Sequence, residues 1–285
     1  MPRPSRRTVT VLTTAALIAA AAPAGAHATF GQGKKPGAKP TTELVGVTKG
    51  TKLVRFDADR PAIARQIPIR GLADGESVVG LDTRPAGGAL YALGDSGRIY
   101  VVDPRTGAST PAGAPFTPQL DGEFFGFDFN PAVDRIRLTS DANQNLRLVP
   151  DTGQVAFTDG ALGYVAGDPS AGRDPAVVGS AYTNPDTDPA TGTMLYNVDA
   201  ARDALVLQDP PNDGGLKTVG ALGVNVGYRG GFDIGADGTA YAAFIPRGAR
   251  ASSLYTIDLA TGAATAEGRI GFLRGVKLDA LAILP

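Results

Sequence analysis

"FFGFDFNPAVDRIRLTSDANQNLRLVPDTGQVAFTD", residues 124–159, decides the fold, because it contains four short apolar runs divided by turn-forming residues. Alternation of apolar and polar side chains over a few residues is typical of a half-buried strand. Gly, Pro, Asp and Asn between such runs mark tight turns. We therefore predict four consecutive antiparallel strands, "FFGFDFNP", "DRIRLTS", "QNLRLVP" and "GQVAFTD", with "SDANQN" as the turn between the second and third.

The first of these strands is repeated along the chain. Similar segments are "VVGLDT", "VVGSAYTN", "GGFDIG" and "VKLDALAI", and we align the five copies on Asp82, Asp128, Ala181, Asp233 and Asp279. The steps between these positions are 46, 53, 52 and 46 residues. Strand-rich repeats of this length are typical of β-propeller blades, each built from four antiparallel strands.

Turns between the third and outermost strands form a second series. "DPRTG", "VPDTG" and "DLATG" begin at Asp103, Val149 and Asp258, and we assign Asp57 and Asp199 to the matching places. The glycine of such a turn supplies the positive φ that closes a hairpin. Two interleaved series with one period support the interpretation as repeated blades.

The sequence thus predicts an all-β fold, namely a single β-propeller with five blades of four antiparallel strands. Residues 43–285 provide 48.6 residues for each of five blades, whereas six blades would leave 40.5. The last strand motif has no blade after it, and the first segment begins without one. We expect the C-terminal strand to complete the first blade, which closes the ring and removes a free sheet edge. Six blades and an open stack of sheets are the alternatives.

Residues 1–28 have the pattern of a secretory signal peptide. Three arginines precede an apolar run from Val9 to Ala22, and Ala26-His27-Ala28 is a small-x-small cleavage site. We expect residues 29–42 to form a flexible Gly/Pro/Lys linker and residues 43–285 to form the propeller domain. No segment reaches the ~20 apolar residues of a spanning helix. We therefore predict a secreted protein without a transmembrane segment, located in the medium, in the periplasm or at the cell surface.

The composition excludes several function classes. His27, the only histidine, leaves with the signal peptide, and the chain contains no cysteine. Ser-His-Asp and Cys-His catalysis are therefore excluded, as are zinc, copper and haem sites built on His or Cys. Cleavage also removes three arginines and no acids, which leaves 24 basic and 28 acidic residues. A mildly acidic protein is not expected to bind nucleic acid, because such binding requires basic residues against phosphates.

The two runs "FFGFDFNPAVDRIRLTSDANQNLRLVPDTG" and "GLDTRPAGGALYALGDSGRIYVVDPRTG", with the closing "KLDALAIL", resemble an uncharacterised family of secreted bacterial proteins, domain of unknown function family 4394. The resemblance covers residues 43–285. It implies a propeller-like fold and export, and it implies no activity and no catalytic residues. A looser likeness to secreted propellers that bind partners or catalyse lactone and sugar chemistry is one of fold, which does not fix a function.

The repeated aspartates would stand near the central channel of a closed ring. One interpretation is a carboxylate ring that holds a cation, because like charges brought together need a counterion. The other is architectural, with each aspartate accepting hydrogen bonds from backbone N–H groups of its own blade. We favour the architectural role, because a feature repeated in every blade is more often structural. Asp128 stays a candidate metal ligand.

Two polar segments resemble parts of calcium loops. In "TNPDTDPATGT", Asn184, Asp186 and Asp188 alternate on a turn and could converge on Ca²⁺. The alternative is an insertion rich in turn formers, since no glutamate follows at the distance that an EF-hand requires. Asn143 and Asn145 match the start of a calcium loop less well, and we keep them as candidate binding residues. Calcium is therefore the one candidate cofactor, and the alternative is that the protein has no cofactor.

"GVNVGYRGG" places Asn225, Tyr228 and Arg229 before an innermost strand, where loops cover one mouth of a propeller channel. Arg with Tyr could grip a carboxylate or stack on a sugar. Equally, Arg229 could pair with one of the repeated aspartates.

These observations support two functions. The first is a non-enzymatic binding or interaction module, expected to be a monomer, with an extracellular protein or glycan as its partner. The second is a cation-dependent hydrolase or lyase acting on a lactone or sugar, with the metal held in the channel and activating water.

Overall fold

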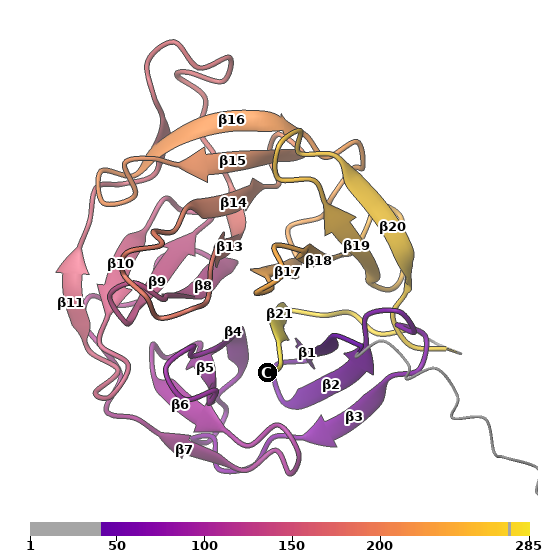
Figure 1. Ribbon diagram of the computed structural model, residues 1–285. Helices are drawn as coiled ribbons and strands as arrows, with labels where there is room; N and C mark the ends of the chain where they lie inside the picture. Colours follow the sequence, from indigo (N-terminus) through magenta and orange to yellow (C-terminus); the bar gives the residue numbers. More distant parts are fainter. Residues whose placement is uncertain (1–40, 273–274) are drawn as a thin grey trace, which may run out of the picture. The chain divides into compact units, whose positions relative to one another are not determined.

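The computed structural model describes residues 41–272 and 275–285, which form 21 β-strands and no helix. The strands assemble into five sheets arranged in a ring, so the predicted five-bladed propeller is confirmed (Figure 1). The predicted signal peptide, and the linker up to residue 40, lie outside the described residues.

Each blade is an antiparallel sheet whose innermost strand faces the channel. From the inside outward, blade one contains β21 (Ala280–Ile283), β1 (Glu43–Thr48), β2 (Lys52–Asp57) and β3 (Arg65–Pro68). Blade two contains β4 (Val78–Thr83), β5 (Leu90–Gly94), β6 (Ile99–Val102) and β7 (Ser109–Pro111). Blade three contains β8 (Phe125–Asn130), β9 (Arg135–Ser140), β10 (Asn145–Leu148) and β11 (Val155–Thr158).

The two remaining blades follow the same order. Blade four contains β13 (Val177–Tyr182), β14 (Leu195–Asp199), β15 (Ala204–Gln208) and β16 (Gly215–Ala221). A short additional strand, β12 (Gly163–Tyr164), pairs parallel to β16 and covers the outer edge of this blade. Blade five contains β17 (Gly230–Ile234), β18 (Ala240–Phe244), β19 (Ser253–Ile257) and β20 (Ala264–Arg269).

The C-terminal strand closes the ring, as the sequence predicts. β21 pairs antiparallel with β1, with Leu44 opposite Ile283 and Gly46 opposite Leu281. Hydrogen bonds from Asp279 N to Val47 O and from Leu284 N to Glu43 O extend the pairing at both ends. Blade one is therefore assembled from the two ends of the domain, and neither end leaves an unpaired inner edge.

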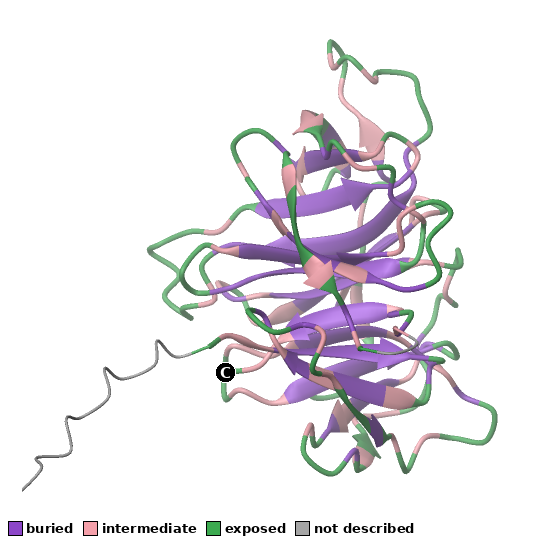
Figure 2. Ribbon diagram, turned by 90° about the vertical axis from the view of Figure 1, so that its right-hand side faces the viewer, coloured by how far each residue is buried: buried purple, intermediate pink, exposed green. Residues whose placement is uncertain are grey.

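Packing between blades buries most strands on both faces (Figure 2). Large apolar clusters join blades one and two, two and three, four and five, and five and one. Among the described residues, no apolar cluster of similar size joins blades three and four. Buried polar side chains fill that gap instead, and Arg137, with an exposed fraction of 1%, is the largest of them.

Glycines allow the innermost strands to converge around the channel. A Cβ atom at Gly231 would lie 2.2 Å from Leu281 N, and one at Gly126 would lie 2.1 Å from Ser180 Oγ. These distances are far below van der Waals contact, so any side chain there would push neighbouring blades apart. The glycine of the repeated strand motif is thus required by the radius of the ring.

One turn assignment from the sequence is wrong. Asp199 lies at the end of β14, in the turn to the third strand of blade four, whereas its expected counterparts lie between third and outermost strands. The matching residue in blade four is Asp209, whose N–H donates to Gly215 O across that turn, as Asp103 N does to Ala108 O. The error arises because both turns begin with aspartate and because the long loop 183–194 displaces the later strands of this blade.

Candidate functional site

Three aspartates from three blades meet at one end of the channel. Asp82 on β4, Asp128 on β8 and Asp233 on β17 each offer a carboxylate oxygen, and these oxygens lie within 4.8 Å of one another. All three side chains are buried, with exposed fractions of 5%, 4% and 8%. We call this group the aspartate cluster.

The aspartate cluster anchors the backbone of all five innermost strands. Three bonds cross to the next blade, from Phe129 N to Asp82, from Tyr182 N to Asp128 and from Ile283 N to Asp233, at 2.7, 2.9 and 2.6 Å. Two further bonds stay within a blade, from Thr83 N to Asp82 and from Ile234 N to Asp233, both at 2.6 Å.

Five N–H groups therefore use five of the six carboxylate oxygens. The sixth oxygen, Oδ2 of Asp128, accepts no hydrogen bond from the residues that the structure describes. The architectural role expected from the sequence is present, although most of the donors belong to the neighbouring blade rather than to the aspartate's own blade.

The alignment of Asp279 with the other three aspartates is wrong by three residues. Ile283 N occupies the place of Phe129 N and Tyr182 N, so the residue of β21 that matches Asp128 is Ala282. Asp279 precedes β21 and lies at the opposite end of the channel, where it pairs with Arg229. The cluster thus has three members, because blades four and one carry Ala181 and Ala282 at its level.

Burial and mutual repulsion make the aspartate cluster difficult to ionise. Loss of hydration, followed by the charge of Asp233, raises the pKa of Asp82 well above its usual range. Loss of hydration and the charges of Asp82 and Asp233 raise the pKa of Asp128 similarly. Burial also raises the pKa of Asp233, to about 6, although two backbone N–H groups act against the shift.

A cavity of about 630 Å³ opens above the aspartate cluster, and we call it the carboxylate cavity. Its volume lies within the range of about 300–1,000 Å³ that is typical of small-molecule sites. Its walls include Phe129, Tyr182 and the C-terminal residue Pro285. None of its lining residues is basic, and Glu43 and Asp237 add acidic groups. The cavity is therefore an apolar-walled space with a strongly acidic floor.

The carboxylate cavity does not continue through the molecule. Midway along the channel, Phe127, Phe232 and Leu281 leave a space of only about 10 Å³. This is about the minimum that one water molecule requires. The two mouths of the channel are consequently separate sites.

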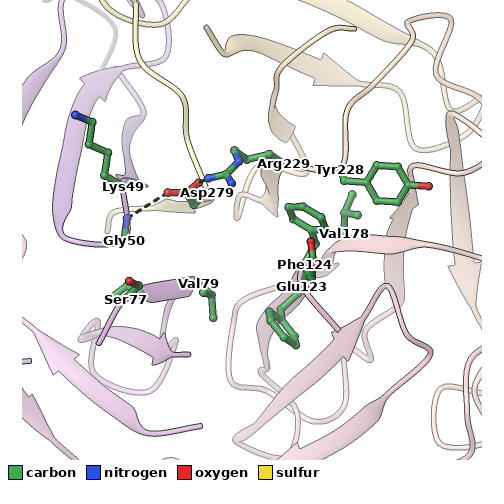
Figure 3. Close-up of a pocket in the computed structure, with 13 residues that line it drawn as sticks. Lys49, Gly50, Ser77, Val79, Glu123, Phe124, Val178, Tyr228, Arg229 and Asp279 are labelled. Carbon is green, nitrogen blue, oxygen red and sulfur yellow. Dashed lines mark hydrogen bonds and ion pairs between the residues drawn. The ribbon is translucent and has the colours of Figure 1, made fainter. Parts of the chain in front are cut away.

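The other mouth forms a smaller pocket of about 190 Å³, shown in Figure 3, which we call the aromatic pocket. Phe124 and Tyr228 line one side, with ring centroids 5.7 Å apart. Arg229 extends to the other side and forms an ion pair with Asp279, whose second oxygen accepts a 3.3 Å hydrogen bond from Gly50 N. The pairing of Arg229 with an aspartate, one of two roles considered from the sequence, is therefore present.

The candidate residues from the turn "SDANQN" have structural partners. Asn145 is buried and donates to Gly160 O and Pro211 O at 2.9 and 3.1 Å. Asn143 adopts a φ of 67° and donates to Asp174 at 2.8 Å. The sequence reasoning missed the role of Asp141, which accepts hydrogen bonds from the N–H groups of Glu123 and Phe124 at 2.9 and 3.1 Å and so positions one wall of the aromatic pocket.

The candidate calcium loop of blade four holds itself together. Asp186 accepts from Asp188 N and Thr191 Oγ1 at 3.1 and 2.8 Å, and Asn184 donates to Gly192 O at 3.0 Å. Within residues 41–272 and 275–285, the aspartate cluster is the only group of three or more His, Cys, Asp or Glu side chains close enough together to hold a metal ion. Asn225 does not line the aromatic pocket, although Tyr228 and Arg229 do.

Comparisons with known proteins identify a family and similar folds. A family model described as "Domain of unknown function (DUF4394)" matches residues 52–282, which is most of the chain. No curated protein matches the chain. A chain in the crystal structure of a nidogen/laminin complex is similar, with a TM-score of 0.49 and 16% identity, over 86% of this chain and 98% of that one.

A second similar chain comes from the crystal structure of a structural genomics protein of unknown function from Bacteroides thetaiotaomicron VPI-5482. Its TM-score is 0.45 and its identity 15%, over 80% of this chain and 58% of that one, so this chain spans less than two thirds of that protein's length.

Among the described residues, none belongs to a helix long and apolar enough to span a membrane.

Proposed function

The chain belongs to the DUF4394 family, and we propose that its propeller is an exported, non-enzymatic binding module that holds a small ligand against a divalent cation. The observation that carries this proposal is the aspartate cluster, whose three buried carboxylates lie within 4.8 Å on the floor of a cavity of about 630 Å³. Three like charges without a basic partner in the cavity wall require either protons or a cation.

Calcium is the cation that we propose for this oxygen set. Ca²⁺ binds six to eight oxygens in a flexible geometry and so accepts carboxylates that backbone N–H groups already hold in place, whereas Mg²⁺ demands a near-ideal octahedron and usually keeps several waters. The three oxygens lie within 4.8 Å of one another, as the ligands of one ion must. Asp128 Oδ2, which lacks a hydrogen-bond donor among the described residues, would be the principal ligand.

A cation at this position would leave coordination sites directed into the carboxylate cavity. Three carboxylates supply at least three of the six or more oxygens that Ca²⁺ requires, and water or a ligand would supply the rest. A ligand with hydroxyl or carboxylate oxygens could then bind the ion while its apolar part contacts Phe129 and Tyr182. This arrangement gives the module both a polar anchor and an apolar wall.

The same observation supports a second candidate, a cation-dependent hydrolase or lyase acting on a lactone or sugar. A cation at the floor of a cavity can activate a bound water molecule. The described residues contain no histidine or cysteine to assist, so any proton transfer would depend on the carboxylates themselves. We rank this candidate second because all three carboxylates also anchor backbone N–H groups.

The location that we propose rests on the signal-peptide pattern of residues 1–28. We propose export with cleavage after Ala28, so that the mature protein begins at Thr29. Outside the cytoplasm, calcium is plentiful enough for weak sites of the extracellular type to fill. We propose that the exported protein acts as a monomer and meets an extracellular protein or glycan there.

The first experiment is metal analysis of the purified mature protein, with melting curves in calcium, in magnesium and in chelator. Binding to the folded state alone stabilises it by RT ln(1 + [L]/Kd), which is about 2.7 kcal/mol at one hundred times Kd. We expect one calcium ion per chain and a higher melting temperature in calcium than in chelator. Asp128→Asn should abolish this difference, because it removes a ligand charge while an amide oxygen can still accept from Tyr182 N.

Asp186→Asn in the exposed loop of blade four is the matched control, and its calcium response should equal that of the wild type. A metal-free protein whose melting ignores calcium would refute the proposal, and a response lost in Asp186→Asn but kept in Asp128→Asn would move the site to the loop. Hydrolysis assays on lactones and aryl glycosides separate the two candidates, because calcium-dependent turnover that disappears in Asp128→Asn would establish the enzyme.

A further inference from the structure

We propose that the aromatic pocket at the opposite mouth is a second binding site, which takes a single neutral pyranose ring of a glycan. This site shares no residue with the carboxylate cavity, and the closed middle of the channel separates the two. The inference is therefore independent of whether the aspartate cluster binds a cation.

One wall of the aromatic pocket is suited to the apolar face of a sugar. Tyr228 keeps 39% of its surface exposed and lies beside Phe124. A tyrosine with an apolar body and a polar tip is typical of binding surfaces. Asp141 holds the backbone of Phe124 in place, so the wall is fixed before a ligand arrives.

The opposite wall decides between a neutral and an anionic ligand. Arg229 is already neutralised by Asp279, and Glu123, which also lines the pocket, would repel an anion. Figure 3 shows the Lys49 side chain directed away from this ion pair. A carboxylate would therefore have to displace Asp279, whereas neighbouring hydroxyls can donate to Asp279 and accept from Arg229 at the same time. Charge-assisted hydrogen bonds of this kind are stronger than neutral ones.

The size of the aromatic pocket limits the ligand to about one ring. Its volume of about 190 Å³ is below the range of about 300–1,000 Å³ of sites for drug-sized molecules. The pocket is open to solvent at the mouth of the channel, so the rest of a glycan chain can extend outward. We therefore expect recognition of one terminal or side-chain sugar unit rather than of a long segment.

The test is an NMR or calorimetric titration of the mature protein with a panel of methyl pyranosides and their uronate counterparts. Chelator is present throughout, so that a cation in the carboxylate cavity plays no part. We expect at least one neutral pyranoside to bind saturably and its uronate to bind more weakly. Tyr228→Ala should weaken binding about tenfold or more, the effect of losing one aromatic contact of about 1.4 kcal/mol.

Two variants make the assignment specific. Phe157→Ala removes another exposed aromatic ring, on β11, and should leave the affinity unchanged. Asp279→Asn frees Arg229 while an amide oxygen can still accept from Gly50 N, so this variant should shift the preference toward the uronate. Failure of every neutral pyranoside to bind, tighter binding of the uronate by the wild type, or equal binding by Tyr228→Ala would each overturn the proposal.

Discussion

The two faces of blade three are built from opposite kinds of side chain, apolar on one and polar on the other. Toward blade two, the alternating residues of β8 to β10 are apolar and pack in one cluster with Tyr91, Leu93 and Ile99. Toward blade four, the intervening residues are polar, and Arg137, Thr139 and Asn145 bond with side chains across or along the gap. The alternation of apolar and polar residues along these strands thus gives blade three one apolar interface and one hydrogen-bonded interface.

Arg137 organises the polar face. Its guanidinium donates to Asp159 at 2.6 Å, to Asn145 at 2.7 Å and to Asn212 at 2.8 Å. A fourth hydrogen bond, of 3.3 Å, reaches the hydroxyl of Tyr182 in blade four. Every partner fixes both a distance and an angle, whereas apolar contacts fix neither.

The difference between the two faces shows which blade contact fixes the geometry of the aspartate cluster. Tyr182, held by Arg137 through its hydroxyl, donates its backbone N–H to Asp128 in the aspartate cluster. The polar face therefore sets the position of blade four relative to the carboxylate that we propose as the principal calcium ligand. The apolar side chains of the other face stabilise the contact with blade two through burial.

Among the substitutions that test this difference, we expect Arg137→Leu to have the largest effect. The substitution removes the hydrogen bond to Asn212 Oδ1 and leaves Asp159 with the donors of Arg147, while Asn145 Oδ1 keeps a 3.4 Å bond from Gln208. Loss of one partner from a buried charged network costs about 3–5 kcal/mol. We expect the free energy of unfolding, measured by urea denaturation, to fall by that amount. A loss below about 1 kcal/mol, typical of an exposed ion pair, would show that the network is dispensable.

Leu138→Ala, at the adjacent position of β9, is the corresponding change on the apolar face. Leu138 is fully buried, and truncation of a buried leucine to alanine costs about 2–5 kcal/mol. The calcium response of the melting curve should survive this substitution, because no hydrogen bond to the aspartate cluster is involved. Arg137→Leu, by contrast, should reduce it, and equal calcium responses in the two variants would contradict the division of roles between the faces.

Acidity tests the aspartate cluster, to which the polar face is connected through Tyr182. The pKa of Asp233 is raised from 3.8 to about 6 in the folded protein, so the folded state binds more protons than the unfolded state between these values. In chelator, the stabilising contribution of Asp233 is therefore fully present below about pH 4. It is lost as the pH rises through about 6, which lowers the free energy of unfolding by about 3 kcal/mol. Urea denaturation at pH 4.5 and pH 7 measures the change.

Asp233→Asn removes the titrating group and should flatten this pH dependence, while calcium should counteract it by stabilising the ionised carboxylates. Stability of the wild type that instead rises between pH 4.5 and pH 7 in chelator would show that the aspartate cluster does not govern this range.

Blade number, strand order and ring closure could be predicted because they depend on sequence patterns that are local to each strand and each repeat. Alternation within each strand and the repeat of 46 to 53 residues are visible without any tertiary contact. The membership of the aspartate cluster was only partly predictable. "KLDALAI" and "GFDIG" look alike along the chain, and only the N–H of Ile283, which reaches Asp233 across the ring, shows that Ala282 and not Asp279 is the equivalent residue.

The polar face of blade three could not be predicted for a different reason. In "RIRLTS", a strand with one apolar face, the alternate polar residues are expected to meet water. Inside a propeller both faces of a blade are covered, so Arg137 and Thr139 become buried and must find partners. The sequence shows which residues are polar, and only the ring shows that they are enclosed.

The last prediction compares the stability losses caused by substituting the two asparagines of the turn "SDANQN", which we expect to be the smallest. Asn145 is buried, so Asn145→Ala removes partners from Arg137, Gly160 O and Pro211 O and should cost about 1–3 kcal/mol. Asn143→Gly should change stability by less than about 0.5 kcal/mol. Glycine adopts the φ of 67° without strain, and the lost hydrogen bond to Asp174 is exposed.

The amide oxygen of Asn143 is also buried without a partner among the described residues, so its removal offsets part of that loss. Thermal melts of the two variants under the same conditions are sufficient to compare them. Equal losses would mean that the polar face extends into the turn, and a large loss confined to Asn145→Ala would place the boundary of the buried network between these two residues.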